Sequence, residues 1–426
     1  MTKLEEIPNN PTIHLMEAIL DKDNMNKAYL QVKRNGGAPG IDGLGVDDIA
    51  GYLKENKTKI IEELLNGSYK PKPVKRVLIP KPDGGERQIG IPTVLDRIIQ
   101  QSITQILSPI FEKIFTDHSY GFRPKRSCHM AIRKAKEYIE EGNEFVVDID
   151  LEKFFDTVNH NKLLNLIAKE IKDKAVLSLI NKYLKSGIMI GKNYRETEEG
   201  TPQGGNLSPL LSNIMLHELD KELEKRGHKF CRYVDDCNIY VKSEKAGNRV
   251  MGGISYFIEH RLKLKVNQKK SAVGSPYERK FLGFSFYKGK DKKLKIRVHP
   301  KSIKKLKDKV KKLMPRKNER SIIQTIASLK PLLQGWWNYY RIDEFKSTMR
   351  DINGWIRRHM RLCIWKSWKG VKSRFNHLIK HGINRENATR YANTRKGAWR
   401  IAGSAILTTS LTNSYFEKLG FKGLGS

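Results

Sequence analysis

Two adjacent aspartates between apolar segments constrain the fold of this chain more than any other feature. Asp235 and Asp236 follow the apolar residues 230–234 and precede the apolar residues 238–241. Short apolar runs on both sides of a polar step are typical of two strands joined by a hairpin turn. Asp150 ends a further apolar run elsewhere in the chain. The pattern predicts a sheet that carries carboxylates at the ends of its strands.

Three carboxylates in such positions favour a metal site. Mg²⁺ takes oxygen ligands and keeps several of its waters. Two such ions about 3.5–4 Å apart can activate a hydroxyl for attack and stabilise a leaving pyrophosphate. Aspartates also favour turns for conformational reasons, so the pair alone is weak evidence. Because a third acid ends another strand, we expect Asp150, Asp235 and Asp236 to bind two Mg²⁺ ions, which Mn²⁺ can replace.

The overall charge points to nucleic acid as the partner. The formal net charge is +35, from 81 basic and 46 acidic residues. A compact chain this basic repels itself unless an anion compensates, and phosphate contacts gain affinity by releasing counterions. A highly soluble basic protein and a protein that touches acidic lipid are the alternatives. The four cysteines form no CxxC pair, which argues against a zinc-bearing module.

Two segments have the composition of nucleotide-binding loops. Residues 74–79 and 87–91 flank a proline- and glycine-rich turn and predict a two-stranded finger. Its cations would grip a triphosphate or simply solvate a hairpin tip; they are Lys75, Arg76, Lys81 and Arg87. The glycine-rich residues 200–206 include Gln203, which would meet a nucleotide or template base, or stand in a helix-entry turn.

The last third of the chain changes composition near residue 288. It is lysine-rich, then tryptophan-rich, and its apolar residues recur at helical spacing. The aromatic residues 335–340 and 355–368 alternate with cations, so the rings would either stack on bases or form a helical core. We expect a domain boundary at about residues 290–300 and weaker ones near 68 and 370.

Taken in chain order, these segments resemble the reverse transcriptase and maturase proteins of group II introns, the bacterial IIC-like forms in particular. The resemblance covers nearly the whole chain, and the order of its polymerase blocks is far more specific than any single block. The blocks are RVLIPKPDGGERQIGIPTVLDRIIQ (76–100), HSYGFRPKRSCHMA (118–131), DIDLEKFFDTV (148–158), GTPQGGNLSPLLSNI (200–214), RYVDD (232–236), LKVNQKKS (264–271) and KFLGFSF (280–286).

The resemblance implies an α+β right-hand polymerase whose fingers and palm contain antiparallel sheet, followed by an α-helical thumb and a small basic carboxyl-terminal domain. The regions expected from it are an amino-terminal extension with the start of the fingers (1–68), fingers and palm (69–290), a helical thumb or maturase domain (291–370) and a DNA-binding-like segment (371–426).

The resemblance also implies roles for single residues. Asp150, Asp235 and Asp236 match the catalytic aspartates; Asp148 competes with Asp150, which we prefer because Phe155 follows it by five residues, as the family places an aromatic ring. Phe155 would exclude a ribose 2′-hydroxyl, and Lys270 would protonate the leaving pyrophosphate. The other deoxynucleotide-binding positions are Lys81, Arg87, Pro202, Gln203 and Gly204, and the primer-grip positions are Phe281, Leu282, Gly283 and Phe284.

The expected function is RNA-directed DNA synthesis, with deoxynucleotides, an RNA template and a DNA primer or target as partners, together with binding of intron RNA for splicing and mobility. No membrane partner is expected. The first ten residues lack an apolar signal core, which predicts a cytoplasmic protein that associates with the nucleoid when it engages DNA. The chain stops without a zinc-containing endonuclease, so we do not expect it to cleave target DNA.

Three alternatives remain open on sequence alone. A non-enzymatic maturase would fold RNA without synthesis, although the intact acids argue against it. A domesticated relative would serve host DNA repair or phage defence; its one support is Val234, because family members usually carry alanine there. A β-branched residue beside the metal site would change how the primer end seats. A basic nucleic-acid-binding scaffold would bind without synthesis even after the acids were removed.

Overall fold

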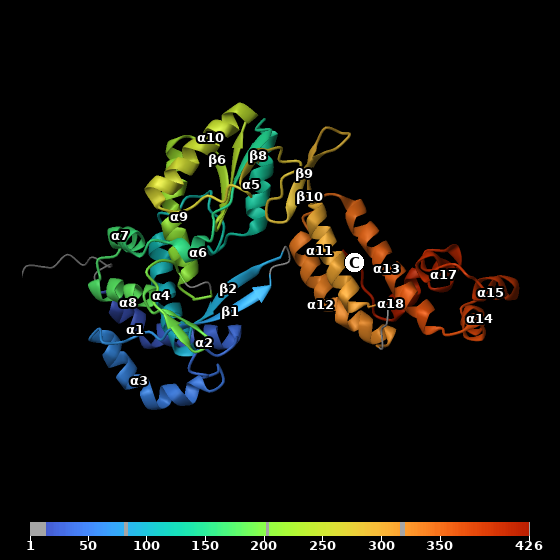
Figure 1. The fold of residues 1–426 in the computed structure, drawn as a ribbon, viewed down its shortest axis with the longest axis horizontal. Helices are drawn as coiled ribbons and strands as arrows, with labels where there is room; N and C mark the ends of the chain where they lie inside the picture. The colour runs from blue at the N-terminus through green and yellow to red at the C-terminus, as the bar shows by residue number, and fades with distance from the viewer. Residues whose placement is uncertain (1–13, 81–83, 202–203, 316–319, 426) are drawn as a thin grey trace, which may run out of the picture. The chain divides into compact units, whose positions relative to one another are not determined.

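The fold was examined in a computed structural model that describes residues 14–80, 84–201, 204–315 and 320–425. The chain divides into two compact units, Met1–Ser275 and Pro276–Ser426 (Figure 1). Each unit encloses its own apolar core. In the described parts of the chain, no helix has the length and apolar character needed to cross a membrane.

The first unit is a mixed α+β body. Its helices are α1 (Leu15–Leu20), α2 (Lys22–Asn35), α3 (Ile49–Leu65), α4 (Val94–Glu112), α5 (Cys128–Glu140), α6 (Phe154–Thr157), α7 (His160–Glu170), α8 (Lys174–Leu184), α9 (Ser208–Lys225), α10 (Glu244–Tyr256) and the π-helix η1 (Phe257–Leu262). Its strands are β1 (Val74–Pro80), β2 (Glu86–Ile91), β3 (Phe145–Ile149), β4 (Ile188–Ile190), β5 (Asn193–Arg195), β6 (Lys229–Tyr233), β7 (Asp236–Val241) and β8 (Ala272–Gly274).

One sheet carries the predicted carboxylates. Its strand order is β6-β7-β3-β8, and each neighbouring pair is antiparallel. Val147, Phe230 and Ile239 are fully buried, because helices α5, α9 and α10 pack against its strands. The three-dimensional sheet therefore confirms the prediction that short apolar runs next to the acids are strands.

The second sheet of this unit has the order β2-β1-β4-β5. Strands β1 and β2 form the predicted two-stranded finger, with Arg87 paired to Ile79 in register. The short strands β4 and β5 extend this sheet through a parallel pairing of β4 with β1, which the sequence pattern did not indicate. Helix α4 follows β2, and Thr93 caps it by accepting a hydrogen bond from the amide of Asp96.

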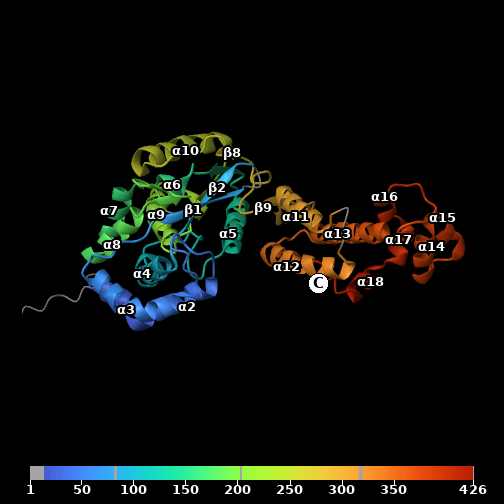
Figure 2. The ribbon, with the colours of Figure 1, turned by 60° about the horizontal axis from the view of Figure 1, so that its bottom comes forward.

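The second unit begins with a two-stranded antiparallel sheet and continues as helices (Figure 2). The elements are β9 (Phe284–Lys288), β10 (Leu294–Val298), α11 (Pro300–Leu313), α12 (Ile322–Tyr340), α13 (Lys346–Ser367), α14 (Val371–Lys380), α15 (Arg385–Ala392), α16 (Ala398–Ala402), α17 (Ala405–Ser410) and α18 (Asn413–Lys418). The division between the units follows Ser275, whereas the compositional change near residue 290 falls in the turn between β9 and β10.

Residues 281–287 do not form one continuous strand. Phe281 and Phe284 exchange backbone hydrogen bonds of 3.0 and 2.9 Å across a two-residue turn, and only then does β9 begin. Leu282 and Gly283 have φ of 48° and 87°, the positive values that a type I′ turn requires. This turn is hard to foresee from the sequence, because leucine, its first central residue, is not a typical turn residue.

Candidate active site

The sheet brings the three predicted acids to one edge. Strands β3 and β7 are neighbours, with Ile149 opposite Cys237. One further step along this register places Asp150 across from Asp236, although these two residues are 86 positions apart in the sequence. Asp235 precedes Asp236 in the turn between β6 and β7. Asp148, the competing candidate, lies within β3 between β7 and β8.

The carboxylate of Asp235 is electrostatically strained. Its burial, together with the nearby charge of Asp150, raises its pKa above the ordinary value, while Arg87 and Arg232 act in the opposite direction. A cation placed between Asp150 and Asp235 would relieve their repulsion, and two carboxylates are the donor set that hard divalent cations prefer. Among the described residues, no three His, Cys, Asp or Glu side chains are already gathered as a metal cluster. The fit to Mg²⁺ thus rests on the carboxylate chemistry of Asp150 and Asp235.

The backbone of Asp150 is held by a later block of the chain, residues 264–271. The amide of Asp150 donates to Ser271 Oγ at 3.0 Å, and its carbonyl accepts from the amide of Asn267 at 2.8 Å. Lys270 lies between these two residues in sequence, and its Nζ is 3.8 Å from Asp150 Oδ2. The predicted general acid is thus beside a predicted metal ligand. Ser271 and Asn267 were not predicted to take part, although they belong to the segment LKVNQKKS.

Phe155 lies in the short helix α6, and the glycine-rich loop at residues 200–201 packs directly against the backbone of this helix. The amide of Thr201 donates to the carbonyl of Phe155 at 2.6 Å. A Cβ on Gly200, whose φ is 91°, would lie 2.9 Å from the same carbonyl oxygen, so only glycine fits there. Phe155, Gly200 and Thr201 line a cavity of about 310 Å³ together with Arg76 and residues of β2, β4 and β5.

The structure describes only some of the predicted triphosphate-binding residues. Lys81, Pro202 and Gln203 lie outside the described residues. Arg87 is exposed on β2, and its charge reaches Asp235. Gly204 has a φ of 120°, and a side chain there would collide with the carbonyl oxygen of Gly90 in β2. The structure therefore brings the finger strand, the glycine loop and the acids into one region.

Arg76, one of the predicted triphosphate-binding cations, forms an ion pair within the protein in this structure. Its guanidinium is 3.7 Å from Asp156, the residue after Phe155. Both side chains are partly exposed, so the pair contributes at most about 1 kcal/mol to stability. Its main consequence is positional, because it links β1 to the helix that carries Phe155.

The predicted primer-grip residues belong to the second unit. The turn at Leu282 and Gly283 is held from outside, since Tyr339 donates to the carbonyl of Leu282 at 2.9 Å. Ser302 donates to the carbonyl of Gly283, also at 2.9 Å. A Cβ on Gly283 would lie 2.6 Å from the hydroxyl of Tyr340. The tyrosines of the aromatic run therefore support this turn.

The rings of that aromatic run pack on one another. Trp336 and Tyr340 have centroids 4.5 Å apart, and Phe284 contacts Tyr340 at 5.1 Å. Trp365 and Trp368 are buried in the core of the second unit. The sequence left open whether these rings stack on bases or form a helical core. Their packing on one another agrees with the helical core.

Comparison with known proteins shows similarity to two families over separate parts of the chain. Residues 79–286 match the family described as reverse transcriptase (RNA-dependent DNA polymerase), and residues 303–382 match the group II intron maturase-specific domain. The chain is 37% identical over 288 residues to the group II intron-encoded protein LtrA of Lactococcus lactis subsp. cremoris, which covers 66% of this chain and 47% of LtrA. It therefore spans about half the length of that relative.

Two further similarities were found. Protein YkfC of Escherichia coli (strain K12) is 34% identical over 273 residues, covering 55% of this chain and 72% of YkfC. A solved partial Cas6-RT-Cas1–Cas2 complex contains a chain with 23% identity and a TM-score of 0.38, covering 58% of this chain and 43% of that one.

Proposed function

We propose, because this chain belongs to the family of reverse transcriptases encoded by group II introns, that it extends the 3′-hydroxyl of a primer with deoxynucleotides on an RNA template. The observation that carries the proposal is the placement of Asp150 and the Asp235–Asp236 pair at one edge of the sheet, where burial and the charge of Asp150 raise the pKa of Asp235. Such an arrangement is costly without a cation and is typical of metal-dependent chemistry.

The mechanism follows from the positions of the chain's own groups. Asp150, Asp235 and Asp236 would hold two Mg²⁺ ions, or Mn²⁺ in their place. When bound, these ions lower the pKa of the primer hydroxyl and neutralise charge on the phosphates. Lys270, 3.8 Å from Asp150, would donate a proton to the departing pyrophosphate.

The remaining residues would select and orient the nucleotide. Arg87 would bind the triphosphate with paired N–H donors, and Lys81, Gln203 and Gly204 would complete the pocket. Phe155 would lie under the sugar and exclude a 2′-hydroxyl. Its position is supported by the hydrogen bond from Thr201 and by the close approach of Gly200.

A second activity is supported by the maturase match over residues 303–382. We propose that the second unit binds intron RNA and assists splicing, in the cytoplasm of a bacterial cell and at the nucleoid during insertion into DNA. Its helix α11 supports this, since it carries lysines on its exposed face and buries Leu306 and Val310 on the other. Recognition of RNA would rest largely on backbone and 2′-hydroxyl contacts.

Primer extension on an RNA template tests the polymerase proposal. The protein should incorporate deoxynucleotides with Mg²⁺ or Mn²⁺, and Asp235→Ala should abolish incorporation while binding to template–primer is retained. Asp47→Ala is the matched control, because this exposed aspartate lies outside the site and the same change should leave the rate unaltered. Binding without synthesis by the parent protein would refute the polymerase and favour a purely RNA-folding maturase.

A further inference from the structure

The turn that presents the acids adopts a conformation its first residue disfavours. Val234 has a φ of 61°, and it is the first of two residues between β6 and β7. A positive φ at this position alone is the pattern of a type II′ turn, where glycine is preferred. A β-branched residue in this region is an outlier that persists only where its surroundings determine it. The chain around Val234 should therefore contain a device that holds the turn.

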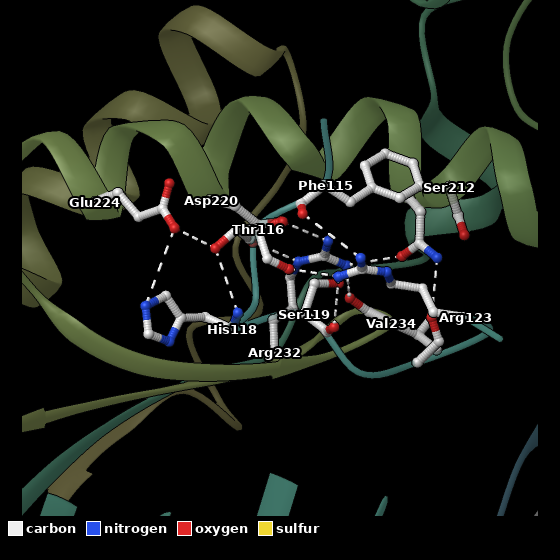
Figure 3. Close-up of polar contacts among 12 residues, drawn as sticks. Phe115, Thr116, His118, Ser119, Arg123, Ser212, Asp220, Glu224, Arg232 and Val234 are labelled. Carbon is white, nitrogen blue, oxygen red and sulfur yellow. Dashed lines mark hydrogen bonds and ion pairs between the residues drawn. The ribbon is translucent and has the colours of Figure 1, made fainter. Parts of the chain in front are cut away.

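Arg232 provides such a device from inside the sheet. Its side chain is fully buried, and its Nη1 donates to the carbonyl oxygen of Val234 at 2.9 Å. The same nitrogen donates to Asn213 Oδ1 at 3.1 Å. Nε and Nη2 each reach one oxygen of Asp220 at 2.6 Å, which fixes the plane of the guanidinium. Figure 3 shows Arg232 together with Asp220 of α9 and the carbonyl of Val234.

The loop before α5 also contacts this part of the chain. Asn213 Nδ2 donates to the carbonyl oxygen of Gly121 at 2.9 Å. A Cβ added to Gly121 would lie 2.5 Å from the amide nitrogen of Val234 and 2.6 Å from its Cγ2. Tyr120 donates its amide to the carbonyl of Arg232 at 2.9 Å. Helix α9 and the loop before α5 therefore enclose the turn between them, and Asn213 connects both sides.

We propose that Arg232, oriented by Asp220 and Asn213, is a positioning residue that holds the Val234 carbonyl and thereby sets where Asp235 and Asp236 stand. The inference rests on the proposed function in one respect, namely that these two acids bind the divalent cations. It goes beyond that function by assigning the buried ion pair to the geometry of the metal site. A buried ion pair is weak evidence for a purely stabilising role, since well-packed apolar residues serve as well or better.

The first test replaces the pair by apolar side chains. In the double variant D220L/R232M no charge of the pair is left buried and unpaired, so we expect the fold to be retained while the hydrogen bond to Val234 is lost. We expect the single-turnover rate of deoxynucleotide addition to fall at least tenfold and the Mg²⁺ concentration for half-maximal rate to rise. The dissociation constant for template–primer should stay within twofold of the parent. A folded double variant with parental rate and Mg²⁺ requirement would overturn the proposal.

The second test displaces the turn while the ion pair stays intact. Gly121→Ala pushes a methyl group against the backbone of Val234 and should produce the same loss of rate and the same rise in Mg²⁺ requirement. Gly252→Ala is the matched control, because that exposed glycine of α10 would place its Cβ within 4 Å of no described atom outside its own helix. If D220L/R232M does not fold, Gly121→Ala decides: a parental rate refutes the positioning role, and a reduced rate supports it.

A metal-binding measurement separates this inference from the proposed function. Mn²⁺ binding, followed by electron paramagnetic resonance without nucleic acid, should be several-fold weaker in D220L/R232M and Gly121→Ala than in the parent and Gly252→Ala. If the parent fails to extend a primer but this difference is found, the polymerase proposal fails and the positioning role stands. If the parent is active and all variants bind Mn²⁺ equally, the positioning role fails and the polymerase proposal stands.

Discussion

At the scale of single residues, the ionised carboxylate of Asp235 lowers the stability of the metal-free protein. Burial and the charge of Asp150 raise its pKa, so the ionised form is less favourable in the folded than in the unfolded state. When the pKa of an acid is higher in the folded than in the unfolded state, this destabilisation is absent at pH values below the unfolded-state pKa. It grows as pH rises from the unfolded-state pKa to the folded-state pKa and is constant above that. The two carboxylates therefore have the electrostatic strain expected of side chains that are arranged to bind a cation.

Asp235→Asn should therefore stabilise the metal-free protein while abolishing synthesis. In buffer with a chelator, the melting temperature at pH 7 should rise relative to the parent, and the gain should vanish as pH falls below about 4. Excess Mg²⁺ should narrow the difference by stabilising the parent alone. Thermal unfolding across pH measures both effects, and a lower melting temperature for the variant at pH 7 without metal would contradict the electrostatic account.

Phe155 carries the selection between sugars in the proposed mechanism. Shortening it to valine should leave deoxynucleotide addition within a few-fold and raise ribonucleotide addition by roughly tenfold to a hundredfold, because the steric barrier to the 2′-hydroxyl is removed. Single-nucleotide incorporation with paired deoxy and ribo substrates measures this ratio. An unchanged ratio would place the sugar elsewhere in the cavity.

At the scale of elements, Asp96 ties helix α4 to its neighbours. This buried carboxylate accepts from the hydroxyls of Tyr69 at 2.8 Å, Thr93 at 2.7 Å and Tyr183 at 3.3 Å, and from the amide of Lys72 at 3.2 Å. Burial is the main reason its pKa is raised, and these hydrogen bonds oppose that shift. Helix α4, helix α8 and the segment before β1 therefore depend on one side chain.

Asp96→Ala should destabilise the first unit by about 3 kcal/mol or more, because several buried donors lose their acceptor. Urea unfolding followed by circular dichroism measures the loss. The exposed Asp47→Ala should change stability by no more than about 0.5 kcal/mol. Equal stability of the two variants would mean that water replaces the lost carboxylate.

At the scale of the whole molecule, the net charge of +35 predicts that affinity for nucleic acid depends strongly on salt. If the bound protein neutralises six to ten phosphates, affinity for a template–primer should fall by about 10³–10⁵ between 50 and 200 mM salt. Fluorescence anisotropy over a salt series gives the slope directly. A slope near zero would show that the basic surface is not the binding surface.

The sequence by itself determined what depends on neighbouring residues. Apolar runs next to Asp150 and the Asp235–Asp236 pair predicted the strands, and composition predicted a nucleic-acid partner. These signals are local, since strand and helix periodicity and capping act over a few residues. The order of the polymerase blocks added the family, and the family matches bear it out.

Only the tertiary structure decided how distant segments meet. The pairing of β3 with β7, the addition of β4 to the finger sheet and the burial of Arg232 against Asp220 all join residues far apart or on different elements. Sequence periodicity carries no information about register between strands that are not joined by a tight turn. Arg232 reads as an ordinary cation in the sequence, and only the packed fold makes it the support of the turn that carries the acids.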